Sequence, residues 1–190
     1  MPAAPRLGRP GRSRSCRAQG LSLVESLVAL AVLAIVAGAA LPAFTALAEQ
    51  RHLQGVAAQF EADVQFARDS AELRAQSVRL TFFDGADGPR CWLVHTGEPE
   101  ACRCDAVTGS AACDAPSELL RASVLPGTVP LRLAPNAASV RFSAPRHTVS
   151  PALTLTLSAR SGRSVSEVVS VVGRVRGCAP AGAVPGFRSC

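Results

Sequence analysis

The sequence contains no tyrosine and no lysine, and only 4% of its 190 residues are aromatic. Within the basic segment 160–190, Phe187 is the one aromatic residue. A surface that stacks single-stranded bases needs several aromatic rings, so it is poorly supported. The signatures of common catalytic sites are also missing, namely H-E-x-x-H, the P-loop, G-x-S-x-G and G-x-G-x-x-G. We therefore predict no enzymatic activity, no cofactor and no metal site.

Charge is distributed unevenly along the chain. All 20 basic residues are arginine, which indicates a compositional bias and makes arginine content alone weak support for any function. Residues 1–20 hold five arginines and no acid, and residues 21–118 hold six arginines and 13 acids. Residues 119–190 hold nine arginines and a single acid, Glu167. This polarity predicts an anionic partner for the C-terminal part.

The basic N-terminal stretch precedes an apolar run, Leu27 to Leu41, that no charge interrupts. A secretory signal would place a small-residue cleavage site after such a run, but no A-x-A site with a polar break follows it. The sequence instead favours a cut before the run, between Gly20 and Leu21. This cut would remove residues 1–20 as a leader and leave the hydrophobic segment on the mature chain.

Residues 20–25, G-L-S-L-V-E, and Pro42 further along the apolar helix resemble the type IV prepilin and type II secretion pseudopilin superfamily. The resemblance implies that an inner-membrane prepilin peptidase removes the leader and methylates the new amino group, on Leu21. Gly20 suits such a site because a residue without a side chain lets the enzyme approach the backbone closely.

The same resemblance implies that Glu25 pairs with the terminal amine of a neighbouring subunit during assembly. An unpaired carboxylate is costly near hydrocarbon, so a glutamate in a membrane segment is a functional candidate. A second interpretation stays open, in which Glu25 only lies at the membrane surface.

A long helix is predicted in two halves. Residues 21–48 form a transmembrane half, because Leu21 to Leu41 can just cross about 30 Å of bilayer at about 1.5 Å per residue; the resemblance implies that this half also forms the filament core. Residues 49–76 form an amphipathic half whose apolar residues recur every three or four positions. These residues are Leu53, Val56, Phe60, Val64, Ala67, Ala71 and Ala75. The charged residues expected to face solvent are Arg51, Glu61, Arg68, Asp69 and Glu72.

Residues 77–177 are predicted to form a β-rich head, because the apolar period changes to two and turn signals such as Pro126-Gly127 recur. The expected strands are Val78–Phe83, Cys91–Thr96, Leu119–Val124, Val129–Leu133, Ser139–Ser143, Ala152–Ser158 and Val165–Val175. The expected fold class is α+β, with a long N-terminal helix packed on a small antiparallel β-sandwich. Residues 178–190 form a C-terminal tail.

Seven cysteines are present, and Cys16 lies in the predicted leader. The remaining six suit disulfides formed outside the cytoplasm, and they are Cys91, Cys102, Cys104, Cys113, Cys178 and Cys190. Six cysteines allow 15 pairings, among which local closure favours bridges within residues 91–113 and a third between Cys178 and Cys190. The segment Glu98–Ser117 shows no strand pattern, and its cysteine spacing matches no strong zinc motif.

The expected last strand ends in G-R-V-R, residues 173–176. Alternate side chains of an extended chain share a face, so Arg174 and Arg176 are expected to project side by side while Val175 points the other way. Charge on an exposed sheet edge also protects against aggregation, and that interpretation stays open.

With the head pattern and the C-terminal cysteine, this ending resembles the FimT/GspH branch of the superfamily. Some FimT-like minor pilins bind DNA through such a tail, which implies DNA contact by Arg174 and Arg176. Local charge adds Arg160, Arg163 and Arg188 as candidates. Guanidinium groups would bind phosphate oxygens in a salt-sensitive way that is largely independent of base sequence.

The predicted function is that of a minor type IV pilin, FimT-like, that contributes to pilus assembly and binds extracellular DNA for uptake. The alternative is a GspH-like minor pseudopilin of a type II secretion system with a structural role only. Either subunit would have other pilins or pseudopilins and the prepilin peptidase as partners. Either would span the bacterial inner membrane once, with its head in the periplasm, before it enters a pilus or pseudopilus.

Overall fold

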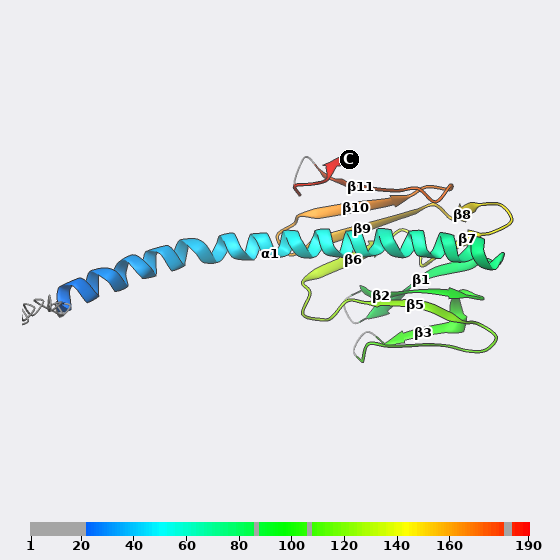
Figure 1. The fold of residues 1–190 in the computed structure, drawn as a ribbon, viewed down its shortest axis with the longest axis horizontal. Coiled ribbons are helices and arrows are strands. Elements are labelled where there is room, and N and C mark those ends of the chain that lie inside the picture. Colours follow the sequence, from blue (N-terminus) through cyan, green and yellow to red (C-terminus); the bar gives the residue numbers. More distant parts are fainter. Residues whose placement is uncertain (1–21, 86–87, 106–107, 181–183) are drawn as a thin grey trace, which may run out of the picture. The chain divides into compact units, whose positions relative to one another are not determined.

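The computed structural model describes residues 22–85, 88–105, 108–180 and 184–190 (Figure 1). The chain divides into two compact units, one up to Ala43 and one from Phe44 to the C-terminus. The predicted leader, the cleavage residues Gly20 and Leu21, and Cys16 lie outside the described residues.

The first unit is the apolar part of α1, the helix Leu23–Arg74. By length and composition it could cross a membrane. Its leucine, valine and isoleucine side chains are exposed all round, as expected for a helix whose apolar partners are lipid or neighbouring subunits. Ser22 precedes the helix, and its Oγ accepts a hydrogen bond of 3.2 Å from the backbone N–H of Glu25. This is half of a capping box and explains why the helix begins here.

In the second unit, the apolar stripe of α1 is buried as the spacing predicts, except at Val56, which is partly buried, and at its end. Leu53, Phe60 and Val64 are fully buried, and the charged residues expected to face solvent are exposed. Ala75 does not belong to the stripe, because the helix ends at Arg74 and Ala75 is exposed with a φ of +50°. The stripe also includes a residue that the apolar pattern passes over, the buried Asp63.

The head contains more strands than the seven that periodicity predicts. The strands are β1 (Val78–Gly85), β2 (Gly88–Thr96), β3 (Cys102–Asp105), β4 (Ser110–Cys113), β5 (Leu119–Val124), β6 (Leu131–Pro135), β7 (Ser139–Ser143), β8 (Thr148–Ser150), β9 (Leu153–Ala159), β10 (Ser164–Val169), β11 (Val175–Ala179) and β12 (Arg188–Ser189). A short 3-10 helix, η1, spans Pro99–Ala101.

Two predictions about the head are wrong. The segment Glu98–Ser117 is not irregular, because η1 and the hairpin β3–β4 lie within it. The expected strand Val165–Val175 is two antiparallel strands, β10 and β11, joined by a turn. Apolar residues alternate in the same way in both strands of a hairpin. The sequence pattern of Val165–Val175 therefore does not reveal that the chain reverses direction within it.

The strands form two five-stranded sheets, ordered β5-β2-β1-β7-β8 and β12-β11-β10-β9-β6, and β3–β4 forms a separate ribbon. Pairing is antiparallel except between β11 and β12, which are parallel. In Figure 1, β9, β10 and β11 lie above the head part of α1, and β1, β2 and β5 lie below it. One core cluster contains side chains of α1 and of both sheets. Within it, the Phe60 ring of α1 is 6.2 Å from that of Phe82 in β1 and 6.0 Å from that of Trp92 in β2.

Among the described residues, three disulfides connect segments of the head. Cys91 pairs with Cys104, Cys102 with Cys113, and Cys178 with Cys190. The first two attach the β3–β4 ribbon to β2 and close it on itself. The third, with the Cys190 N–H bonded to the carbonyl of Ala179 at 3.2 Å, holds the end of the chain against β11.

Candidate nucleic-acid interface on the C-terminal sheet

The turn between β10 and β11 presents Arg174 to solvent. Its backbone pairs with Ser170, since the Ser170 N–H donates to the Arg174 carbonyl at 3.0 Å and the Arg174 N–H donates to Ser170 Oγ at 3.2 Å. Gly173 precedes it with a φ of +75°, a conformation that favours glycine. Arg174 therefore lies just before β11 rather than within a strand, yet its side chain is exposed as predicted.

Arg176 and Arg188 line one groove on the outer face of this sheet. Arg176 stands opposite Val168 of β10, and Arg188 stands opposite Cys178 across the parallel β11–β12 pair. The groove has a volume of about 610 Å³ and is lined also by Gly177, Ser189 and Cys190. The Cys178–Cys190 disulfide fixes β12, and so it fixes the position of Arg188 relative to Arg176.

The side chains alternate across β11 as expected. Arg174 and Arg176 are exposed, whereas Val175 between them is partly buried and packs against the core. Among the described residues, none of Arg174, Arg176 and Arg188 forms an ion pair. Three unneutralised guanidinium groups thus lie along one edge of the head, which gives this surface a strong preference for anions.

The structure separates Arg160 and Arg163 from this group. Both lie in the turn between β9 and β10, at the opposite end of β10 from Arg174. The six residues of β10 span roughly 17 Å. Arg163 also donates from Nη1 to the backbone carbonyl of Ala46 at 3.1 Å. Arg160 and Arg163 were predicted to contact DNA only because they are close to Arg174 in sequence. The β10–β11 hairpin puts them at the other end of the sheet from Arg174.

Glu167, the single acid after residue 118, cannot neutralise the basic groove because it faces inward. Its side chain is 3% exposed. Burial, and secondarily the nearby charge of Glu61, raises the pKa of Glu167 from 4.5 to about 7. The carboxyl group lies under Gly177, where an added Cβ would stand 2.6 Å from Oε1 of Glu167 and 2.8 Å from the ring of Phe187.

A polar cluster that the sequence analysis missed joins α1 to the first sheet. Both carboxylate oxygens of the buried Asp63 are engaged: Gln59 and Arg121 donate to Oδ1 at 3.0 Å each, and Trp92 Nε1 donates to Oδ2 at 2.8 Å. The hydroxyl of Ser123 also donates to Oδ2. The sequence did contain a signal for this cluster, because Asp63 lies three positions after Phe60 and therefore on the apolar face of the helix. With its donors supplied by one helix and two strands, this cluster is a structural link.

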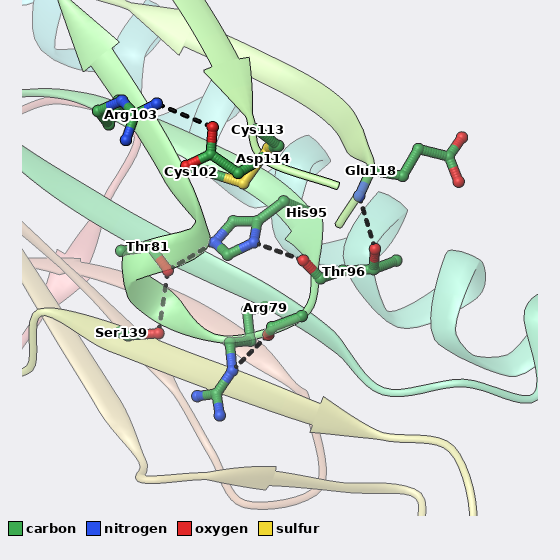
Figure 2. The surroundings of a disulfide bond; sticks show 11 residues. Arg79, Thr81, His95, Thr96, Cys102, Arg103, Cys113, Asp114, Glu118 and Ser139 are labelled. Carbon is green, nitrogen blue, oxygen red and sulfur yellow. Dashed lines mark hydrogen bonds and ion pairs between the residues drawn. A yellow bond between two sulfur atoms is a disulfide. The ribbon is translucent and has the colours of Figure 1, made fainter. Parts of the chain in front are cut away.

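Figure 2 shows a third group, around the Cys102–Cys113 disulfide. A ring nitrogen of His95 and the two sulfur atoms lie within 4.8 Å of one another. Both sulfurs are joined in the disulfide, and the ring nitrogens of His95 bond to Thr81 Oγ1 and to the carbonyl of Thr96, each at 2.9 Å. Burial lowers the pKa of His95, with Arg79 adding to the effect and the Thr96 carbonyl opposing it. His95 is thus best described as a neutral, buried histidine that packs against the disulfide.

Comparisons with known families and structures agree with this architecture. A family model described as type II transport protein GspH matches residues 56–173, and one described as the prokaryotic N-terminal methylation motif matches residues 15–41. No curated protein matches the sequence.

Two solved structures illustrate the likeness. The type IV minor pilin FimU of Pseudomonas aeruginosa is 18% identical with a TM-score of 0.52, and the match covers 70% of this chain and 96% of that one. The minor pseudopilin EpsH from the type 2 secretion system of Vibrio cholerae is 12% identical with a TM-score of 0.48, covering 68% and 98%. The likeness to FimU confirms the predicted pilin-like fold.

Proposed function

Because the chain belongs to the type II transport protein GspH family and is therefore a minor pilin or pseudopilin, we propose that it is a minor type IV pilin that binds extracellular DNA for uptake. Such a subunit is anchored by its apolar helix and assembles with other pilins in a filament. The finer assignment rests on one observation, the basic edge formed by Arg174, Arg176 and Arg188.

The chemistry of this edge suits a duplex backbone. Guanidinium groups stay charged at all relevant pH and offer paired N–H donors to phosphate oxygens. Arg176 and Arg188 share a groove of about 610 Å³, whose other described lining residues offer the Val168 side chain and sulfur, hydroxyl and backbone atoms; none of these residues is aromatic. Contacts of this kind read the phosphate backbone rather than the bases. The expected ligand is therefore double-stranded DNA of any sequence.

Fluorescence anisotropy of a labelled duplex, titrated with the full chain in detergent at several salt concentrations, tests the proposal. The double variant Arg174→Gln/Arg176→Gln should bind roughly tenfold more weakly, with the slope of log affinity against log salt reduced by about 2. Arg132→Gln/Arg160→Gln is the matched control, because it removes two exposed arginines near the opposite end of β10 from Arg174. Equal duplex binding by the two double variants would contradict the assignment.

The competing function is a minor pseudopilin with a structural role only, which the family description favours. It predicts that the unaltered chain does not bind duplex DNA at low salt. The assay with the unaltered chain therefore separates the two functions before any variant is made.

Processing and assembly are proposed to be common to both functions. The prepilin peptidase cuts between Gly20 and Leu21, the chain spans the inner membrane once, and the head lies in the periplasm. Glu25, which is exposed on α1, pairs with the terminal amine of a neighbouring subunit because a lone carboxylate there would be costly. Glu25→Gln should abolish copurification with partner pilins, whereas Glu49→Gln should not. Intact copurification of the Glu25 variant would assign that residue to the membrane surface.

A further inference from the structure

A second basic hollow lies on the head, away from the groove of Arg176 and Arg188. It has a volume of about 480 Å³ and is lined by the loop 127–130, the start of β6 and the end of β9. Three of its lining residues are arginines: Arg90 of β2, Arg132 of β6 and Arg160 after β9. None of the described residues that line it is acidic. Three guanidinium groups around one hollow favour an anionic ligand.

The hollow has a fixed wall and an open rim. Arg90 is partly buried, donates from Nη1 to the carbonyl of Val129 at 3.1 Å, and accepts the Leu125 N–H at its own carbonyl at 2.8 Å. Arg132 and Arg160 are exposed at the rim. The planar donor arrays of arginine match the oxygens of a phosphate group, and a side chain already held in place loses less entropy when it binds one.

The position of the hollow on the head indicates the source of the phosphate. Arg160 and Arg163 share the β9–β10 turn, and Arg163 fastens this turn to α1 through the carbonyl of Ala46. On this stretch of the helix, Phe44 is 68% exposed and Leu47 is 47% exposed. Exposed apolar side chains beside basic ones are typical of surfaces that lie at the boundary between lipid tails and headgroups.

We propose that Arg90, Arg132 and Arg160 bind the phosphate of an anionic phospholipid headgroup and hold the head at the membrane surface before the subunit enters a filament. Each arginine near an anionic lipid surface contributes a favourable electrostatic term. Duplex DNA is a poorer fit, because β10 separates this hollow from the exposed Arg174 and Arg176. The proposal requires the membrane anchor and does not require DNA binding.

Native mass spectrometry of the full chain in nonionic detergent, titrated with phosphatidylglycerol or with phosphatidylcholine, provides the test. The unaltered chain should bind phosphatidylglycerol more tightly than phosphatidylcholine. Arg132→Gln/Arg160→Gln should weaken phosphatidylglycerol binding roughly tenfold and leave phosphatidylcholine binding unchanged. Arg174→Gln/Arg176→Gln removes the same charge from the other group and should keep the lipid preference. Both rim arginines are exposed, and Trp92 emission verifies that each variant is folded.

Three outcomes would overturn the proposal: equal binding of the two lipids by the unaltered chain, no effect of Arg132→Gln/Arg160→Gln on phosphatidylglycerol, or inorganic phosphate that competes as strongly as the lipid. A loss of duplex DNA binding in this variant, with lipid binding intact, would instead assign the hollow to the nucleic-acid surface. Failure of the DNA proposal alone would leave the lipid preference in place, so the two proposals fail separately.

Discussion

The arginines of the head behave differently on the two sides of residue 124. Up to β5, most arginines form an ion pair with an acid, namely Arg68, Arg74, Arg79, Arg103 and Arg121. Among the described residues, Arg51 and Arg90 of this region form none. From β6 onward, no arginine forms an ion pair with an acid among the residues that the structure describes. The first region supplies nearly all the acids of the head, whereas the second has only Glu167, which is buried and faces α1 rather than the arginines.

This difference teaches that the role of an arginine here depends on its partners. Arg121 is held by Asp63 at 3.0 Å and stacks on the Phe66 ring at 4.0 Å from its centroid, so its charge is used to fasten a helix to a sheet. Arg176, which is exposed and forms no ion pair with any described residue, keeps its charge available to a ligand. Four predictions test this division, from the largest expected effect to the smallest.

Removing the acid at the centre of the paired region should cost the most. Asp63→Ala leaves Trp92, Gln59 and part of Arg121 without their acceptor, and we expect the free energy of unfolding to fall by about 3 kcal/mol. Urea unfolding of the full chain in detergent, followed by circular dichroism, measures this change. Asp69→Ala, on the exposed face of the same helix, should stay within about 0.5 kcal/mol of the unaltered chain. Similar midpoints for the two variants would show that the cluster is not a structural link.

The buried acid of the unpaired region should make stability depend on pH. Between pH 4.5 and about 7 the unfolded chain ionises Glu167 while the folded chain keeps it protonated, so the folded state binds more protons and loses stability as pH rises. Glu167→Gln lacks this penalty. Relative to the unaltered chain, the unfolding free energy of Glu167→Gln should therefore rise across that range by about 2 kcal/mol. The full difference between the two pKa values sets an upper limit of about 3 kcal/mol. Urea midpoints at several pH values, read from Trp92 emission, measure it. A gain that is constant with pH would contradict the prediction.

The close packing above Glu167 gives the third prediction. Gly177→Ala places a Cβ against the Glu167 carboxyl and the Phe187 ring, so these two side chains must shift, at a cost of about 1–2 kcal/mol. Because Phe187 directly precedes Arg188, duplex affinity should fall as well. Gly55→Ala is the control of opposite sign, since nothing lies within 4 Å of its Cβ and alanine favours a helix. Unfolding midpoints that rise in both variants would show that β11 has room there.

Substituting one arginine from each region, in separate variants, tests the difference between the two regions most directly. Arg121→Gln should lower the unfolding free energy by about 1 kcal/mol, a value reduced by the partial exposure of its side chain, and leave duplex affinity unchanged. Arg176→Gln should do the reverse, with a few-fold loss of affinity and a stability change within about 0.5 kcal/mol. Urea unfolding and anisotropy on the same preparations measure both quantities. Equal effects of the two substitutions on DNA binding would remove the distinction between the regions.

Much of the fold could be predicted from sequence because it depends on local periodicity. The exposed apolar helix, the stripe from Leu53 to Ala71 and most strands follow from residue spacing. Asp63 was missed because periodicity counts apolar residues, and only the donors from β2 and β5 make its burial tolerable. The β3–β4 ribbon was missed because its strands of four residues carry little pattern.

The sequence by itself determined where the helix lies, that the last third of the chain is basic, and that alternate residues near Val175 face opposite ways. Only the tertiary structure decided which arginines act together. The turn at Gly173 reverses the chain, so Arg160 lies at the far end of β10 from Arg174, and the disulfide to Cys190 brings Arg188 beside Arg176. The physical reason is that charge is a property of each residue, whereas its neutralisation and clustering depend on which distant segments the fold places beside it.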